Sequence, residues 1–360
     1  MKLCVKGGKW TVPLKLRPAG SLEVPGLIDL HVHLREPGFE YKEDIESGCR
    51  AAKNGGFAII CCMPNTNPVV DCGEVVSYIK NKAAAIKGIE VLVIGAVTKG
   101  QMGRELADIE GMVKAGICAI SEDGKSVMNS ALMRKAMIKA KELGIPYFSH
   151  AEDENLAGLP IGEELIAARD ILLAKETGCR LHLCHISTAG SIDLIRKAKA
   201  DGINVTAETA PHYFTLDETS VAGNTNRKMN PPLRTRKDVE AIRQALKDGT
   251  IDVIATDHAP HARHEKEAEF DKAPNGVIGL ETSFSVSYTQ LVKTGILTPE
   301  ELIDKMCFKP AEILGLKPSQ LQTKVVFDVD KEYTIQGDDF CSKSVNSPFI
   351  GMKVFGRLEE

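Results

Sequence analysis

Residues 26–38 read GLIDLHVHLREPG, an apolar run that ends in two histidines one residue apart and then in a turn. The stretch 24–33 (VPGLIDLHVH) is typical of a buried strand. Residues two apart on a strand point to the same face, so we expect His31 and His33 to present both imidazoles at its end. A doubly wound open sheet is the structural alternative, but its phosphate-binding glycines would follow the first strand, where this chain has HVHLREPG.

Further runs of strand length follow the first, and stretches with helical spacing separate them. This alternation indicates βα units around a parallel sheet. Because eight strands close a barrel, we predict an α/β fold, a TIM (β/α)₈ barrel that spans residues 24–317. The other strands are expected at 57–63, 90–96, 117–121, 146–150, 181–186, 203–208 and 252–256, and helices at 43–54, 73–87, 104–115, 130–143, 162–177, 188–201 and 236–248.

The two ends of the chain lack helical spacing. Residues 1–23 and 318–360 instead alternate apolar and polar side chains with a period of two and contain turn residues. The simplest arrangement joins both ends in one small β unit beside the barrel.

The composition is that of an ordinary globular protein, with 43% hydrophobic and 26% charged residues. A net charge of −4 gives no reason to expect nucleic acid or an anionic membrane as a partner. The N-terminal residues lack the apolar core of a signal peptide, and no apolar run approaches the ~20 residues of a membrane span, so we expect a cytoplasmic protein. The ten cysteines are scattered without a CxxC pair, which argues against a cysteine zinc site.

Histidines and aspartates recur where the predicted strands end. His150 ends the fifth strand, His185 the sixth and Asp257 the eighth, while Asp123 follows the fourth. Such strand ends converge at one face of a barrel, and imidazole and carboxylate are normal zinc ligands. Each residue alone also has a structural explanation, a hydrogen-bonded histidine or a helix-capping aspartate. The ordered set predicts a metal site.

The order of the motifs is more specific than any one of them. GLIDLHVHLREPG is followed by MPNTNPVVD, SEDG, SHAEDE, HIST, NPPLR and ATDHAPH, and FCSKSVNSPFIG stands near the C-terminus. This series resembles the dihydroorotases of the amidohydrolase superfamily over nearly the whole barrel. The resemblance implies reversible cyclisation of N-carbamoyl-L-aspartate to L-dihydroorotate in pyrimidine (UMP) biosynthesis, with a metal-activated water as nucleophile and Asp257 as general acid and base.

The resemblance also implies one or two Zn²⁺ ions per chain. By motif match, His31, His33 and Asp257 would bind the first metal, and His150 and His185 the second. Many relatives bridge their metals with a carboxylated lysine, but this chain has Ser-Glu-Asp-Gly at 121–124, so Asp123 is expected to take the bridging position.

A dihydroorotase must also recognise the carboxylate of its ring substrate, which suits the guanidinium of Arg35. The motifs assign further substrate contacts to Asn65, Asn230, His261, Asn275 and Gly276. Outside the site, His182 is expected to face away because it stands three residues before His185. We expect His212 to support the site from behind, and His264 to lie in a solvated loop.

Two alternatives remain on sequence alone. Another cyclic-amide hydrolase, such as a hydantoinase, dihydropyrimidinase or allantoinase, would share the metal ligands, although Arg35 argues against the neutral substrates of the first two. A non-catalytic barrel scaffold is the second, yet every matched ligand is present. A homo-oligomer and an association with aspartate transcarbamoylase are both compatible with the resemblance.

Overall fold

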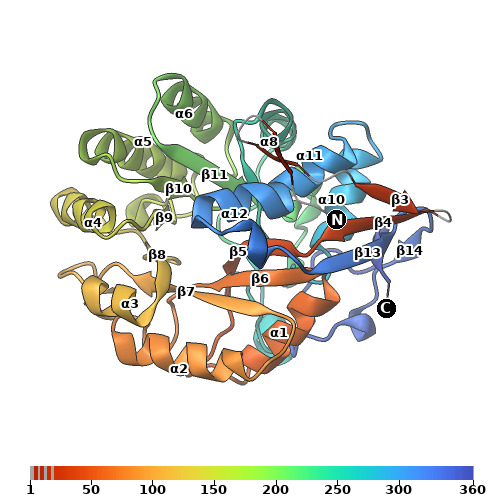
Figure 1. Cartoon of the computed structure of the whole chain (residues 1–360), viewed down its shortest axis with the longest axis horizontal. Coiled ribbons are helices and arrows are strands. Elements are labelled where there is room, and N and C mark those ends of the chain that lie inside the picture. The colour runs from red at the N-terminus through yellow and green to blue at the C-terminus, as the bar shows by residue number, and fades with distance from the viewer. Residues whose placement is uncertain (1–3, 7–8, 12–13, 18–19, 360) are drawn as a thin grey trace.

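The computed structural model describes residues 4–6, 9–11, 14–17 and 20–359, and within them eight parallel strands form one sheet (Figure 1). The strands follow one another in chain order from β5 to β12, as the predicted βα units require. They are β5 (Leu27–Val32), β6 (Phe57–Cys62), β7 (Glu90–Ala96), β8 (Ile117–Ser121), β9 (Tyr147–Ser149), β10 (Leu181–Leu183), β11 (Val205–Thr209) and β12 (Val253–Ile254).

The first and last strands of this sheet meet, which closes the barrel. Val32 forms a parallel bridge with His258, and the backbone N–H of His33 donates to the carbonyl of His258 at 2.8 Å. The buried carboxylate of Asp29 accepts the backbone N–H of Thr256 at 3.1 Å across the same seam. The predicted (β/α)₈ barrel is therefore confirmed.

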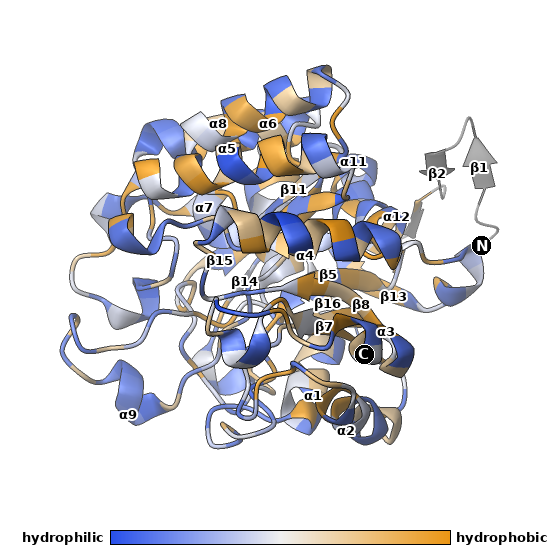
Figure 2. Ribbon diagram, turned by 90° about the vertical axis from the view of Figure 1, so that its left-hand side faces the viewer, coloured by the Kyte–Doolittle hydropathy of each residue, from blue (hydrophilic) through white to orange (hydrophobic). Residues whose placement is uncertain are grey.

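Helices surround the barrel, and each buries an apolar face against the strands (Figure 2). Side-chain caps fix several starts: Asp44 accepts the N–H of Ser47 before α1, and Thr235 accepts that of Asp238 before α8. The helices that alternate with the strands are α1 (Ile45–Asn54), α2 (Gly73–Ala84), α3 (Ile109–Ala115), α4 (Ser130–Glu142), α5 (Pro160–Thr177), α6 (Ala189–Ala200), α7 (Pro211–Thr215) and α8 (Arg236–Asp248).

No helices are predicted after the eighth strand, but the structure has several there. Helix α10 continues into a π-helical stretch over Tyr288–Val292, and α11 continues through another over Asp304–Phe308 into α12. These irregular turns interrupt the helical spacing, which explains why the pattern was missed. The helices are α9 (Arg263–Lys266), α10 (Ser283–Ser287), α11 (Pro299–Ile303) and α12 (Lys309–Leu314).

The strand predicted at 24–33 is wrong in one respect, because it is two strands that belong to different sheets. Residues up to Pro25 complete β4, and the barrel strand β5 starts at Leu27. The N–H of Gly26 donates to the carbonyl of Thr323 instead of continuing either ladder. A Cβ at this glycine would lie 2.5 Å from the Cβ of Ala58, so the close approach at the break requires glycine.

Segments from the two ends of the chain lie side by side in a second sheet, with the order β16-β13-β4-β3 (Figure 1). Its strands β3 and β4 come before the barrel, and β13 and β16 come after it. The expected division into a unit of 1–23 plus 318–360 and a barrel of 24–317 stays a prediction, and part of 1–23 lies outside the described residues. The remaining strands are β1 (Cys4–Lys6), β2 (Lys9–Thr11), β3 (Lys15–Arg17), β4 (Ser21–Pro25), β13 (Lys324–Asp328), β14 (Tyr333–Thr334), β15 (Lys353–Val354) and β16 (Arg357–Leu358).

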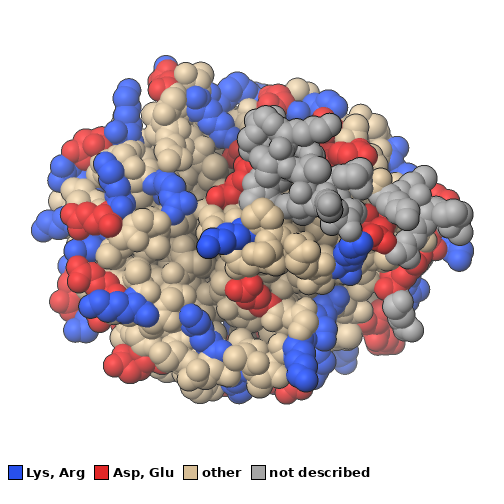
Figure 3. Space-filling view, viewed as in Figure 1, with Lys and Arg blue, Asp and Glu red and all other residues tan. Residues whose placement is uncertain are grey.

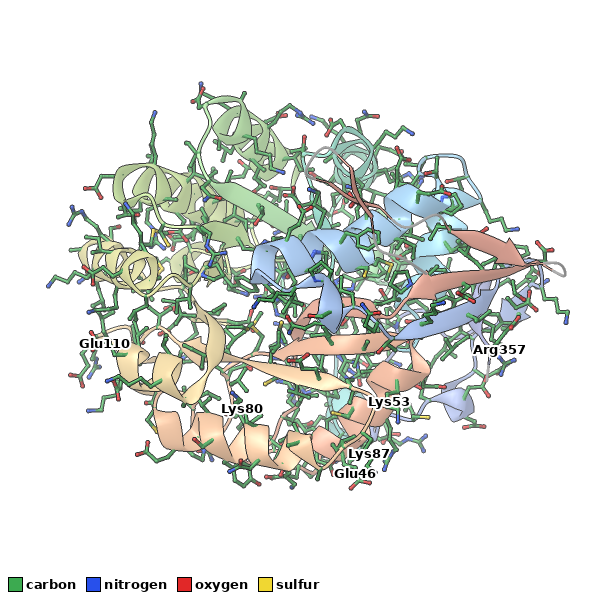
Figure 4. All side chains as sticks on the ribbon, viewed as in Figure 1. Glu46, Lys53, Lys80, Lys87, Glu110 and Arg357 are labelled. Atoms are coloured by element: carbon green, nitrogen blue, oxygen red, sulfur yellow. The ribbon has the colours of Figure 1, made fainter. Side chains whose placement is uncertain are left out.

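The outer surface carries charges of both signs. Lysines and arginines are interspersed with aspartates and glutamates over the face in Figure 3. Figure 4 places labelled charged residues such as Glu46, Lys80 and Glu110 at the periphery, and Glu110 pairs there with Lys139 at 2.7 Å. Among the described residues, none of the helices combines the length and apolar character needed to cross a membrane.

Candidate active site

A cavity of about 210 Å³ opens at the end of the barrel where the parallel strands finish. Loops after the strands bring residues together here from positions far apart in the sequence. All the sequence-predicted site residues line this cavity except His31, which is fully buried beneath it. The lining consists of His33, Arg35, Asn65, Asp123, Gly124, His150, His185, Asn230, Asp257, Ala259, His261, Asn275 and Gly276.

The backbone turns sharply where several of these residues leave their strands. Arg35, His185 and Asp257 have φ values of 63°, 36° and 49°, in the left-handed region that residues with a Cβ rarely adopt. Such conformations cost energy and persist where the surrounding structure holds them, often at functional sites. Here the turn directs three side chains toward the cavity instead of along the barrel wall.

The first group of candidate metal ligands comes from the first and last strands of the barrel, which meet at the seam. Nε2 of His31 lies 3.4 Å and Nε2 of His33 3.2 Å from Oδ1 of Asp257. The two imidazole centroids are 5.3 Å apart, as expected for side chains on one face of the same strand. These three residues form one group that could hold a metal ion.

The second group gathers around Asp123. Its Oδ1 lies 3.6 Å from Nδ1 of His150 and 3.7 Å from Nε2 of His185, and those two ring nitrogens are 2.9 Å apart. The same oxygen is 3.2 Å from Nε2 of His31, while Oδ2 is 3.4 Å from Nε2 of His33. The Asp123 carboxylate thus lies between the two groups, in the position from which a bridging ligand would reach both.

The donor set fits a divalent metal. Two ligand atoms that share an edge of a tetrahedral zinc site lie ~3.3 Å apart, given bonds of about 2.0–2.1 Å. The separations within both groups, from 2.9 to 3.7 Å, are close to that edge. Within the described residues, Nε2 of His31 is buried yet forms no hydrogen bond, although two carboxylates lie within 3.4 Å. A buried ring nitrogen that faces two carboxylates without a hydrogen bond fits a cation site better than it fits an empty core.

Three of the four histidines are held from behind by a partner on the other ring nitrogen. Nδ1 of His31 lies 2.9 Å from Oε1 of Glu208, and Nδ1 of His33 lies 2.8 Å from Oδ1 of Asn65. Nε2 of His150 lies 3.4 Å from Oε2 of Glu152. A hydrogen-bond acceptor beside one ring nitrogen places the proton on that nitrogen. The other ring nitrogen, which faces the cluster, is then free to bind a metal.

Sequence reasoning missed both glutamates. Glu208 lies on β11, and Glu152 stands two residues after His150. The signals available in the sequence were a carboxylate inside a predicted strand and a carboxylate in the motif SHAEDE.

The prediction that His182 faces away is wrong. Its Nε2 lies 3.0 Å from Glu208, because the chain leaves regular strand geometry after Leu183 and His185 turns back at φ 36°. His182 therefore lies beneath the site, with Glu208 between it and His31.

The charges in this cluster are strongly coupled. Burial lowers the pKa of His31, but the carboxylates of Asp123 and Asp257 outweigh it and raise the pKa well above its usual value. The pKa of His150 rises to about 9 against its own burial, through hydrogen bonds to Asp123 and Glu152. Burial would raise the pKa of Asp257, yet His31 and His33 hold it below its usual range. Without a metal, the cluster therefore retains protons that a metal would displace.

The opposite end of the cavity is cationic. Nε of Arg35 donates to the carbonyl of Pro260 at 3.1 Å, and its Nη2 lies 3.3 Å from Nε2 of His261. Nζ of Lys42 is 3.4 Å from Nδ1 of His261, so that nitrogen accepts and Nε2 donates to the carbonyl of Asn275 at 2.8 Å. Burial, together with Arg35 and Lys42, lowers the pKa of His261 to about 3, which keeps it neutral.

Gly276 brings backbone to the same end of the cavity. It has φ 133°, and a Cβ there would lie 2.9 Å from both the Cβ of Ala259 and Nε2 of His261. Only glycine fits this position without displacement. Its neighbour Asn275 is exposed at the rim, so both residues are placed where a ring substrate could meet the backbone.

Asn65 and Asn230, two of the three asparagines predicted to contact substrate, already bind protein partners. Besides its contact with His33, the amide of Asn65 donates to Oδ2 of Asp123 at 3.4 Å. Nδ2 of Asn230 donates to Oε2 of Glu152 at 2.7 Å. The structure thus brings both to the cavity wall, and their role in substrate binding stays a prediction.

The two other histidines singled out in the sequence differ in their surroundings. His212 is buried, and burial lowers its pKa to about 4, while the Asp257 carboxylate acts in the opposite direction. Within the described residues its Nε2 has no hydrogen-bond partner. His264 is exposed, as expected, and its ring stacks with that of Tyr41 at a centroid distance of 6.5 Å, but the expected loop is wrong, because this residue lies in helix α9.

Comparison with known proteins identifies the family. A model of the Dihydro-orotase-like family matches residues 20–164. A dihydroorotase of Pelotomaculum thermopropionicum is 49% identical over 366 residues, covering 95% of this chain and 85% of the relative. The dihydroorotase of Ruminiclostridium cellulolyticum is 48% identical over 94% of this chain and 85% of its own length. This chain belongs to the dihydroorotase family. The resemblance seen in the motifs is thereby confirmed.

Solved structures show the same architecture at lower identity. An L-hydantoinase (dihydropyrimidinase) from Arthrobacter aurescens aligns with a TM-score of 0.85 and 25% identity, covering 98% of this chain and 83% of that one. A dihydropyrimidinase from Brevibacillus agri aligns with a TM-score of 0.82 and 23% identity, covering 94% and 83%. This dihydroorotase-family chain therefore shares its barrel fold with cyclic-amide hydrolases.

Proposed function

We propose that the protein is a dihydroorotase, which interconverts L-dihydroorotate and N-carbamoyl-L-aspartate for pyrimidine synthesis. The observation that carries the proposal is the pairing of two features in one cavity, a His/Asp cluster that could hold a metal and, opposite it, the Arg35–His261 end. The metal centre suits hydrolysis of a ring amide, and the guanidinium suits the carboxylate that the ring bears. Identity near 48% to curated dihydroorotases supports the same substrate.

Zinc is the metal we propose, held by His31, His33 and Asp257 in one site and by His150 and His185 in the other, with Asp123 between them. When bound, such a metal activates water near neutral pH and polarises the amide carbonyl. Imidazole nitrogen and carboxylate oxygen are ligands that zinc prefers, and the described cluster contains no competing set of thiolates beyond Cys184.

Asp257 performs the proton transfers in this proposal. Its pKa below the usual range keeps it ionised at neutral pH, ready to take the proton that water loses as its oxygen bonds to the amide carbon. The ring C–N bond then breaks, and Asp257 returns the proton to the leaving nitrogen. In the biosynthetic direction the same steps run backwards, and the carbamoyl nitrogen closes the ring with loss of water.

The remaining cavity residues orient the ring. Arg35 would bind the carboxylate as a bidentate partner, next to the Nε2 side of neutral His261. The backbone of Asn275 and Gly276 would contact the ring amides, and Asn65 and Asn230 would complete the wall. A hydantoinase or dihydropyrimidinase acts on a neutral ring, which would leave the guanidinium without a partner, so we rank those activities second.

The proposal is tested by following both directions of the reaction with the purified zinc-loaded protein. Dihydroorotate should be opened and N-carbamoyl-aspartate closed, and Asp257→Asn should abolish both, because an amide cannot carry the proton. If the protein is instead a non-catalytic scaffold, the wild type should show no turnover. Substantial turnover by Asp257→Asn with its metal intact would assign the proton transfer to another residue.

The protein is also proposed to form a homo-oligomer through α5. This helix is apolar on both sides: Ile166 and Ile171 are buried, whereas Ile161, Leu165 and Leu172 are 46%, 47% and 66% exposed at helical spacing. In a two-fold antiparallel pair of α5 helices, Leu165 of one copy would lie beside Leu172 of the other. Sedimentation equilibrium of Leu172→Glu should then show the mass of one chain, whereas an unchanged mass would exclude this face.

Two other expectations stay predictions. The cytoplasmic location has no further support. Association with aspartate transcarbamoylase would be tested by co-sedimentation of the two purified enzymes.

A further inference from the structure

Asn346 is a buried polar side chain near the cavity that the proposed reaction does not use. It is 2% exposed and belongs to the C-terminal motif FCSKSVNSPFIG. Its Nδ2 donates to the carbonyls of Ala259 at 3.2 Å and Gly276 at 3.1 Å, and its Oδ1 accepts the N–H of His261 at 3.3 Å. The backbone carbonyl of Asn346 accepts the N–H of Ile278 at 3.2 Å.

These bonds join two loops that come from different parts of the barrel. One loop, 257–261, follows β12 and carries Asp257 and His261. The other, 274–278, carries Asn275 and Gly276. An asparagine amide has two donors and one acceptor group, and only the orientation with nitrogen toward the two carbonyls satisfies all of these partners.

The segment around Asn346 is fastened to the barrel on the other side as well. Ser342 donates to the buried carboxylate of Glu43, and the hydroxyl of Ser344 donates to the carbonyl of Lys42 at 2.8 Å. The N–H groups of Cys341 and Ser342 donate to Glu281 at 2.8 and 3.0 Å. Residues 341–346 are therefore held by the loop before α1 and by the start of the segment that leads into α10.

We infer that Asn346 is a positioning residue, which sets the spacing between His261 and Gly276 and thereby the recognition of the substrate ring and its carboxylate. The inference rests on the proposed function, since it gives a purpose to the end of the cavity opposite the metals. Asn346 touches none of the candidate metal ligands except through the chain that leads from Asp257 to His261. Its loss should therefore affect substrate binding more than metal binding.

The test compares Asn346→Asp and Asn346→Ala with Ser347→Ala. Asn346→Asp keeps the size and the acceptor but turns a carboxylate oxygen toward two carbonyls. Ser347 is equally buried, at 2%, and its hydroxyl accepts the N–H of Phe349 within its own segment, which makes it the matched control. Both Asn346 variants should raise KM for dihydroorotate roughly tenfold or more, the effect of one or two lost hydrogen bonds, with kcat and zinc content near those of the wild type.

A second readout does not depend on turnover. Binding of orotate, a planar analogue with the same ring amides and carboxylate, should weaken by a similar factor in calorimetry. Peptides covering 257–261 and 274–279 should exchange amide hydrogen faster in the Asn346 variants than in Ser347→Ala. An unchanged KM, orotate affinity and exchange would overturn the inference while wild-type turnover still supports the proposed function. If the wild type shows no turnover but the Asn346 variants exchange faster, Asn346 does hold the two loops together, and its proposed role in substrate recognition is refuted.

Discussion

Nδ1 of His31 lies 2.9 Å from Oε1 of Glu208, directly behind the point where Nε2 of the same ring faces Asp123 and Asp257. The other carboxylate oxygen of Glu208 lies 3.0 Å from Nε2 of His182. Both oxygens of this buried group are therefore occupied by imidazoles, and the ring of His31 is fixed in its plane and tautomer. A carboxylate in this position also increases the basicity of the ligand nitrogen.

Glu208→Gln should weaken zinc binding by roughly ten- to a hundredfold, because the amide keeps the shape but not the charge of the partner. Competition with a coloured chelator measures the affinity without any assay of turnover. Glu36→Gln is the control, since Glu36 is also buried but binds Tyr78 and Lys82 instead of a candidate ligand. Wild-type zinc affinity in Glu208→Gln would mean that His31 does not need this partner.

Asp123→Ala should lower the zinc content from two equivalents toward one. The carboxylate is the only group whose oxygens lie within 3.7 Å of ligand nitrogens from both sites, among the residues that the structure describes. The site of His150 and His185 would lose its anionic ligand, whereas His31 and His33 would keep Asp257. Elemental analysis after stepwise dialysis against a chelator gives the count. Two tightly bound metals in the variant would remove the bridging assignment.

Zinc binding should release protons at neutral pH. The pKa of His150 lies near 9 in the metal-free protein, above its unfolded value of about 6.5. Its proton must leave before the nitrogen can bind zinc, so the apparent zinc affinity should rise with pH until about 9. Calorimetry in buffers of different ionisation enthalpy measures the released protons. No dependence on the buffer at pH 7 would contradict the raised pKa.

The same pKa predicts how the metal-free protein responds to pH. A histidine whose folded pKa is raised contributes stability below its unfolded pKa, and this contribution is lost as pH rises through the folded value. The metal-free protein should therefore lose thermal stability between about pH 6.5 and 9, while the zinc-loaded protein loses less. Thermal unfolding of both forms across this range provides the comparison.

Arg35→Ala should weaken dihydroorotate binding and leave the zinc content unchanged, because Arg35 contacts Pro260 and His261 and no candidate ligand nitrogen or oxygen. Truncating one partner of a desolvated charge pair costs about 2–5 kcal/mol. Alanine also has a Cβ, so the strain at φ 63° remains and does not confuse the comparison. An unchanged KM and kcat/KM would remove Arg35 from the substrate site.

The order of the elements could be predicted because each strand and helix leaves a local pattern, and helix α8 was predicted at its observed bounds. The split at Gly26 could not, since every residue of β4 and β5 is buried and apolar residues stand on both sides of the break. Only the pairing of β4 with β13, some 300 residues away, separates them.

In the site, too, residues in local motifs could be predicted, whereas residues that act through long-range contacts could not. Strand-end histidines and aspartates stand in recognisable motifs, and the structure gathers them around one cavity. Glu208 and Asn346 stand in no ligand pattern of their own, because what matters is the residue that each touches across the barrel. His182 was misplaced because the alternation of a strand was extended past Leu183, where the strand ends.

In the proposed function, the cationic end of the cavity selects a ring that bears a carboxylate. Dihydroorotate and dihydrouracil share the ring and differ in that group, so the most direct measurement is the ratio of their kcat/KM values with the zinc-loaded protein. Loss of a desolvated charge pair of about 2–5 kcal/mol corresponds to a preference of roughly thirty- to several-thousandfold for dihydroorotate, and the ratio should collapse in Arg35→Ala. Equal or faster turnover of dihydrouracil by the wild type would contradict the account and assign the protein to the hydrolases of neutral rings.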